Sequence, residues 1–203
     1  MKILLIGGES GVGKTTIMRK IIPNLGAGKF ISYKLFKGTY FPSSRVLLAG
    51  IYDGRLFDGS DRLSRICQRD TCEFLSRLNK DLPDILFLAE GDNFFRKDFF
   101  EGVQRAGFDS YHVFLTLNET SRENRHAERL SFQTQKTLNS RITKYSRLMM
   151  ELNRRLILNS NTEDDLNFNQ HILRQIITSH CQNWTECDSS NHPTIELVHS
   201  STA

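Results

Sequence analysis

The chain contains the stretch Gly8-Glu9-Ser10-Gly11-Val12-Gly13-Lys14-Thr15, which matches the pattern G-x-x-x-x-G-K-[ST]. An apolar run at 2–6, typical of a strand buried on both faces, precedes it, and a helical pattern at 14–22 follows it and stops at Pro23. The glycines allow the loop to curl so that backbone N–H groups point at one anion, and the helix N-terminus adds partial positive charge. A glycine-rich turn that happens to precede a helix is the alternative, but strand, spacing, Lys, Thr and helix all agree. The stretch therefore predicts a phosphate-binding loop.

Two side chains of this loop indicate which phosphates it holds. Lys14 is expected to reach the β and γ phosphates of a nucleoside triphosphate, and the Thr15 hydroxyl is expected to ligate Mg²⁺. We therefore predict ATP and Mg²⁺ as cofactors. The predicted nucleotide-binding residues are Gly8, Glu9, Ser10, Gly11, Val12, Gly13, Lys14, Thr15 and Thr16.

The composition is that of a folded globular protein. The chain has 203 residues, 38% hydrophobic and 25% charged, which suits one sizeable core rather than a disordered chain. The apolar start breaks at 7–9 and is too short for a signal sequence or a membrane span, so we predict a cytoplasmic protein without a membrane partner. Four cysteines without a C-x-x-C pair predict no disulfide framework.

Strand and helix patterns alternate along the chain, which predicts an α/β fold. Aromatic and β-branched residues between 29 and 53, with breaks at Gly38 and Pro42, predict an antiparallel hairpin followed by a strand. The predicted class is a three-layer P-loop fold with a central, mostly parallel sheet, a β-hairpin insertion and a helical, Arg-bearing lid. The domain is expected at 1–178, with the lid at about 119–153 and a polar tail at 179–203. Strands are predicted at 2–6, 46–52, 85–89, 111–117 and 156–158, and helices at 14–22, 66–78, 96–105, 119–130, 138–152 and 163–178.

Acidic residues follow the second buried strand. Glu90-Gly91-Asp92 lacks the Asp-Glu pair of motor ATPases, and the chain has no Asn-Lys-x-Asp pattern for reading guanine. At the carboxyl end of a strand, Glu90 or Asp92 could order the water around Mg²⁺ or accept a proton from an acceptor hydroxyl. We predict Glu90 as a catalytic residue and Asp92 as a contact for metal and substrate. Solvated loop acids are the alternative.

The loop 57–64 is rich in groups that can hydrogen-bond a polar acceptor. Asp61 is a second candidate for the catalytic base, Arg62 is a candidate contact for an acceptor phosphate, and Asp58 is predicted to bind substrate with them. A turn with an N-cap for the following helix is the alternative.

Positive charge is concentrated late in the chain, which has a formal net charge of +4. Between 122 and 155 there are nine Lys or Arg and three Glu, so this segment favours polyanions such as nucleotides or nucleic acid. Arg122, Arg125 and Arg129 share one helix face, where Arg125 and Arg129 are predicted to stabilise the transferred phosphoryl group. A solvated charged face is the alternative. The predicted substrate contacts on the next helix are Arg141 and Lys144.

The hairpin combines lysines and aromatic residues, a mixture that can follow a phosphate backbone and stack on bases. An ordinary half-buried strand would show the same alternation. The residues concerned are Lys29, Lys34, Lys37, Phe30, Tyr33, Phe36, Tyr40 and Phe41.

With these motifs in place, the chain to about Thr178 resembles the nucleoside and nucleotide kinase group of P-loop phosphotransferases. Within that group, the segments 50–53, 57–64, 90–92 and 141–144 are similar to those of bacteriophage 5-hydroxymethyluracil DNA kinases. The resemblance implies ATP-dependent phosphorylation of a hydroxymethyl pyrimidine in DNA. The chain departs from that group at Ser60, where Thr is expected, and at 64–67.

The leading hypothesis is therefore an ATP- and Mg²⁺-dependent kinase with DNA as its acceptor. In this scheme Lys14 and Thr15 position ATP and metal, Glu90 or Asp61 takes the hydroxyl proton, and 159–162 contacts the adenine. The alternatives are a soluble deoxynucleoside or nucleotide kinase and, from another class, an ATP-bound switch or scaffold without phosphoryl transfer.

Overall fold

A seven-stranded sheet forms the centre of the molecule in the computed structural model, which describes residues 1–54, 58–128 and 134–182. The strand order is β2-β3-β4-β5-β1-β6-β7, and all pairs from β4 to β7 are parallel. The α/β class predicted from the alternating pattern is confirmed. The strands are β1 (Lys2–Gly8), β2 (Lys29–Tyr33), β3 (Phe36–Phe41), β4 (Val46–Ala49), β5 (Leu86–Glu90), β6 (Asp109–Thr116) and β7 (Arg155–Asn159).

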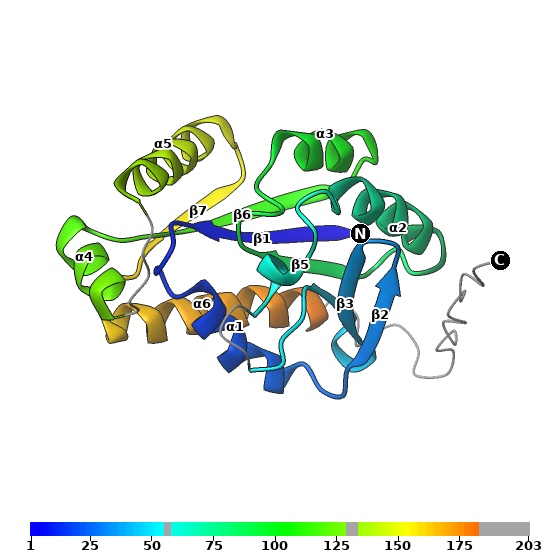
Figure 1. Ribbon diagram of the computed structural model, residues 1–203. Coiled ribbons are helices and arrows are strands. Elements are labelled where there is room, and N and C mark those ends of the chain that lie inside the picture. The colour runs from blue at the N-terminus through cyan, green and yellow to red at the C-terminus, as the bar shows by residue number, and fades with distance from the viewer. Residues whose placement is uncertain (55–57, 129–133, 183–203) are drawn as a thin grey trace.

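Helices cover both faces of the sheet (Figure 1). Because side chains alternate along β1, Ile3 and Leu5 pack into one core cluster with α2, α3 and α5, whereas Leu4 and Ile6 pack into the other with α1 and α6. The layers place the carboxyl ends of β1 and β5 side by side at one edge of the sheet. The helices are α1 (Lys14–Ile21), α2 (Gln68–Asp81), α3 (Lys97–Arg105), α4 (Glu119–Glu128), α5 (Gln135–Glu151) and α6 (Glu163–Gln182).

The hairpin β2–β3 is part of the main sheet, because β3 pairs antiparallel with β4 and extends the sheet at that edge. Its aromatic residues belong mainly to the core. Phe36, Tyr40 and Phe41 are buried, Tyr33 stacks on Phe74, and Phe30 is 57% exposed. The half-buried strand is therefore the better interpretation of this segment.

Several elements end at residues other than those predicted. Strand β4 stops at Ala49 rather than near Tyr52, because Gly50 has φ = +104° and turns the chain away from the sheet. Ile51 then makes a single antiparallel bridge with Gly59. Helix α6 continues to Gln182, beyond the tail boundary predicted at 179.

None of the helices in the described ranges has the length and apolar character that a bilayer crossing requires.

Candidate active site

The loop between β1 and α1 has the backbone form that a phosphate cradle needs. Gly8, Gly11 and Gly13 have φ values of +137°, +89° and +90°, which side-chain-bearing residues rarely adopt. A Cβ on Gly13, the N-cap residue of α1, would lie 2.6 Å from a methyl carbon of Leu166, so a larger residue there would also require the Leu166 side chain to move. The backbone N–H groups at the start of α1 are thereby directed at one point.

Lys14 lies inside this curl. Its Nζ donates hydrogen bonds to the carbonyl oxygens of Gly8 and Glu9, both at 2.8 Å. Burial lowers the pKa of Lys14, while the nearby carboxylates, first that of Glu90, act in the opposite direction. A partly desolvated ammonium group at this position is suited to a polyanion, because a phosphate group restores the charge interactions that burial removes.

Glu90, the last residue of β5, lies beside β1 opposite Ile6. Its Oε1 accepts a hydrogen bond from the Thr15 hydroxyl at 3.3 Å and one from the Tyr52 hydroxyl at 3.5 Å. The side chain is buried, and burial raises its pKa to about 7, with Lys14 opposing the shift and Asp61 adding to it. The carboxylate that meets Thr15 in the structure is thus that of Glu90.

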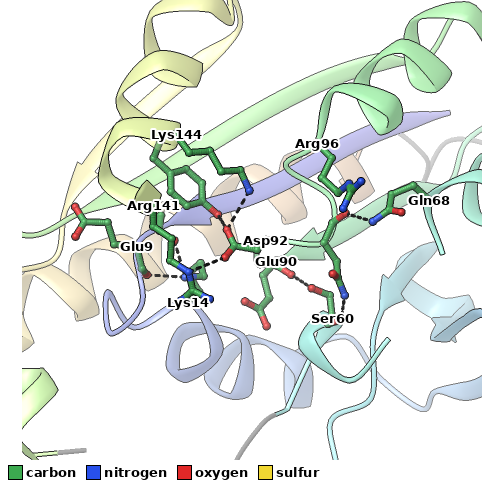
Figure 2. A network of polar contacts seen from close by, with 12 residues as sticks. Glu9, Lys14, Ser60, Gln68, Glu90, Asp92, Arg96, Arg141 and Lys144 are labelled. Carbon is green, nitrogen blue, oxygen red and sulfur yellow. Dashed lines mark hydrogen bonds and ion pairs between the residues drawn. The ribbon is translucent and has the colours of Figure 1, made fainter. Parts of the chain in front are cut away.

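Asp92 is engaged instead by helix α5 (Figure 2). It accepts a hydrogen bond from the Tyr145 hydroxyl at 2.5 Å, and it forms ion pairs with Lys144 and Arg141, both at 3.3 Å. Burial alone would raise the pKa of Asp92, but Lys144 and Tyr145 outweigh it and hold the pKa below its ordinary value. The two predicted substrate contacts on α5 therefore converge on Asp92, whereas the Thr15 hydroxyl contacts Glu90. The use of Thr15 and Asp92 as metal ligands stays a prediction.

Asp61 reaches the same place from the short helix η3 (Ser60–Arg62). Part of the residue is exposed to solvent. The part that faces the surrounding protein loses hydration, and this raises the pKa of Asp61, with Lys14 opposing the shift and Asp92 adding to it. One pocket joins the phosphate loop to these acids, and its lining residues are Ser10, Gly11, Gly13, Lys14, Thr15, Asp61, Gly91, Asp92 and Arg141.

The side chains of Asp58 and Arg62 bond to other residues of the protein. Asp58 is buried and accepts hydrogen bonds from Arg19 at 2.8 Å and from the Gly54 backbone N–H at 3.0 Å. Arg62 forms an ion pair with Asp53 at 2.5 Å. Neither residue belongs to the described lining of the pocket. These contacts correct the prediction that both face the acceptor, because a buried carboxylate saturated by an Arg and backbone amides stabilises the turn instead.

Helix α4 is tied to the phosphate loop through two arginines. Arg122 holds the Glu9 carboxylate with two nitrogens, its Nη2 at 2.9 Å from Oε1, and Arg125 donates to the carbonyl oxygens of Gly11 at 3.0 Å and Asn161 at 3.4 Å. The shared helix face predicted from their spacing therefore meets the loop rather than solvent. Arg129, the third member of that face, lies outside the described residues.

The Arg122–Glu9 pair leads to a prediction for nucleotide affinity. Its side chains are only 18% and 13% exposed, so Arg122→Gln would leave an unpaired carboxylate beside the phosphate cradle. We expect ATP to bind about tenfold more weakly, equivalent to about 1.4 kcal/mol. The double variant Glu9→Gln/Arg122→Gln should recover most of that loss. Calorimetric titration of all three proteins measures both effects, and equal affinity of the single variant and the wild type would contradict the prediction.

Glu90 leads to a prediction for stability against pH. Its pKa is about 7 in the folded protein against an ordinary value of 4.5, so between these pH values the folded state keeps a proton that the unfolded chain has released. The free energy of unfolding contributed by this group therefore falls as the pH rises from about 4.5 to 7, by about 3 kcal/mol at most. Glu90→Gln should flatten this part of the curve. Urea unfolding of both proteins across that range tests it, and parallel curves would contradict it.

The residues at the pocket fit a magnesium-bound nucleotide. Backbone amides and the Lys14 ammonium group suit the phosphates, and the Thr15 hydroxyl next to the Glu90 carboxylate offers the oxygen ligands that Mg²⁺ prefers. Asp61 and Arg141 line the same pocket, so a proton acceptor and a cation, the latter paired with Asp92, lie in one cavity with the phosphate loop. The arrangement is chemically able to hold a triphosphate and a hydroxyl acceptor together.

No protein-family model matches the chain, and no curated protein matches it. Among solved structures the chain is similar to a gluconokinase from Sinorhizobium meliloti 1021, with 13% identity, a TM-score of 0.47, and 90% of this chain and 94% of that one covered. It is also similar to a shikimate kinase from Bacteroides thetaiotaomicron, with 13% identity, a TM-score of 0.37 and coverages of 87% and 98%. Since identities and scores are this low, the activity has to be derived from the site itself.

Proposed function

We propose that the chain is an ATP- and Mg²⁺-dependent kinase, which transfers the γ-phosphoryl group to a hydroxyl. One observation carries the proposal: the phosphate loop, with Lys14 and Thr15, shares a single pocket with Asp61, Asp92 and Arg141, which come from three other segments. A nucleotide-bound switch needs only the loop. An acid and a cation in the lining of the same pocket are what a second substrate requires.

More particularly, we propose that the acceptor is a nucleoside-like group, with 5-hydroxymethyluracil in DNA as the best candidate. The segments 57–64, 90–92 and 141–144, which carry the resemblance to the phage DNA kinases, each contribute a residue to the pocket: Asp61, Asp92 and Arg141. These segments are far apart in the chain, so their meeting at the phosphate loop supports a shared use.

The residues of the pocket have different roles in the proposed transfer. Asp61 accepts the proton of the acceptor hydroxyl. The oxygen of that hydroxyl bonds to the γ phosphorus, and the bond between the γ phosphorus and the β-phosphate oxygen breaks. Lys14 and Arg141 neutralise the charge that spreads over the phosphoryl oxygens. ATP supplies the phosphoryl group and Mg²⁺ the neutralising charge, and Thr15 with Glu90 would hold the metal and its water. The adenine is expected at 159–162, next to Arg125.

A free deoxynucleoside or nucleotide is the second candidate acceptor. The observation that favours it is the burial of Phe36, Tyr40 and Phe41, which leaves Phe30 as the hairpin's exposed aromatic residue in the described structure. A surface that stacks on several DNA bases would need more exposed rings than this. The uneven positive charge still favours a polyanionic acceptor.

Transfer of radiolabel from γ-labelled ATP tests the proposal. The protein is offered DNA containing 5-hydroxymethyluracil, matched DNA containing thymine, free nucleosides and nucleotides, or no acceptor. Label on the modified DNA alone supports the DNA kinase, and label on a free nucleoside or nucleotide supports the second candidate. ATP binding without transfer to any acceptor would leave a switch or scaffold and overturn the kinase.

A further inference from the structure

A buried polar network lies directly behind the pocket and connects α2, the segment after β5 and helix η3 (Figure 2). Gln68 Nε2 donates to the Asn93 carbonyl oxygen at 2.6 Å. Asn93 Nδ2 donates to the carbonyl oxygens of Ser60 at 2.6 Å and Leu63 at 3.2 Å. The Ser60 hydroxyl in turn donates to the Glu90 carbonyl oxygen. Gln68, Asn93 and Ser60 are each at most 8% exposed.

The Asn93 amide holds the short turn that carries Asp61 at both ends. Its two acceptors, the carbonyl oxygens of Ser60 and Leu63, flank Asp61 and Arg62 in the chain. The turn also packs closely on the segment after β5, because a Cβ on Gly91 would lie 2.8 Å from the Ser60 hydroxyl oxygen and 3.3 Å from an Asp61 carboxylate oxygen. Asp61 is therefore placed relative to Glu90 and the phosphate loop by its packing against Gly91 and by the hydrogen bonds of Asn93, which does not line the described pocket.

Breaking the buried hydrogen bonds of this network costs enough free energy to affect the position of the turn. A buried amide or carbonyl left without its partner costs about 1–3 kcal/mol, so the bonds of Asn93 resist any shift of the turn. A displacement of about 1 Å at a reacting group can cost about 10²-fold in rate. None of the network side chains lines the described pocket, so their influence on the reaction passes through the backbone that they hold, which carries Asp61 and, through the Ser60 hydroxyl, Glu90.

We propose that Asn93, supported by Gln68, is a positioning residue that fixes the Asp61 carboxylate at the distance from the phosphate loop that transfer requires. The proposal rests on the proposed function, because it assigns a role in the same reaction. A purely structural role for Asn93 would lower stability and leave the turnover of the folded protein unchanged.

Asn93→Leu tests this, since it removes both N–H donors and keeps the branching and the number of heavy atoms of the side chain. We expect kcat to fall about 10²-fold, while KM for ATP stays within about threefold because the described hydrogen bonds of the Lys14 and Thr15 side chains go to Gly8, Glu9 and Glu90 and not to Gln68, Asn93 or Ser60. Gln68→Leu removes only the outer bond and should lower kcat about tenfold, which provides a second, milder variant if Asn93→Leu folds poorly. Thr71→Val is the matched control, because it removes a buried hydrogen bond from the same helix, to the Cys67 carbonyl oxygen at 2.8 Å, and should leave kcat unchanged.

A double-variant cycle separates positioning from general damage. If Asn93 acts through Asp61, then Asn93→Leu should cost little further activity in a protein that already carries Asp61→Asn. An undiminished second loss, or an unchanged kcat in both network variants, would overturn the proposal while leaving the kinase in place.

A measurement without turnover keeps the test independent of the proposed function. Carboxyl-carbon NMR titration of Asp61 should show the raised pKa of the wild type moving back towards its ordinary value in Asn93→Leu, because the released turn regains water. An identical titration curve in both proteins would contradict the positioning role even if no acceptor were phosphorylated. Absence of transfer by the wild type, with the pKa shift observed, would instead contradict only the proposed function.

Discussion

A Lys14→Ala variant is expected to lose at least 10²- to 10³-fold in phosphoryl transfer, the loss typical of removing one preorganised group that meets developing charge. The Lys14 ammonium group lies in the curl of the loop, 2.8 Å from two carbonyl oxygens, and no other Lys lines the described pocket. Without it, the phosphates keep the backbone dipoles of the loop and Arg141, but lose the ammonium group that lies within the loop. Initial rates at saturating acceptor, together with ATP affinity by calorimetry, measure the change.

The fold should survive this substitution. Burial lowers the pKa of Lys14, which means that the folded protein holds the charged form at a cost, so its removal should not reduce the free energy of unfolding. Lys20→Ala on the same helix is the control, because Lys20 is exposed and its side chain bonds only Asn167 among the described hydrogen bonds. Transfer at the wild-type rate by Lys14→Ala would contradict the whole scheme of phosphate binding.

An Asp61→Asn variant is expected to lower kcat about 10²- to 10⁴-fold, the range for loss of a general base. Asn keeps the shape of the side chain but cannot accept the hydroxyl proton. ATP binding should change little, since the Thr15 hydroxyl contacts Glu90 rather than Asp61. Steady-state kinetics with both substrates varied will show whether the loss lies in kcat.

The matched control is Asp98→Asn, an exposed aspartate on α3 that pairs only with Arg96 among the described ion pairs. Its kcat should equal that of the wild type. If Asp61→Asn retained full turnover while Glu90→Gln lost it, the base would be Glu90, which is the other residue that the sequence offers for this role.

The central elements of the fold follow from local sequence, because strands buried on both faces and helices with one apolar stripe have distinct periods. The run 2–6, the loop after it and the strand ending at Glu90 lie where their patterns predict. Sheet membership is different. The hairpin pairs with β4, which follows closely in the chain, but its place in the main sheet depends on the pairing of β4 with β5 at 86–88, and nothing in residues 29–41 alone distinguishes an insertion from two further strands of that sheet.

The site was predictable only as far as residue type and position after a strand allow. Lys14, Thr15, Asp61, Asp92 and Arg141 do share a pocket. Sequence could not show that Asp92 is held by α5, because Tyr145 belongs to the helix's apolar stripe and only the structure turns its hydroxyl towards that carboxylate. Asn93 and Gln68 carry no motif, and their importance comes from burial and from the carbonyl oxygens they meet.

The position of β1 in the sheet has a consequence for synthesis in the cell. Of the strands in this sheet β1 is made first, yet its neighbours are β5 at 86–90 and β6 at 109–116, so both its edges stay unpaired until much later in synthesis. At about 5–20 residues per second, that delay is on the order of 10 seconds. During this delay neither β5 nor β6 is available to hydrogen-bond with the apolar run 3–6. Chaperones that hold nascent chains are the natural protection against its aggregation.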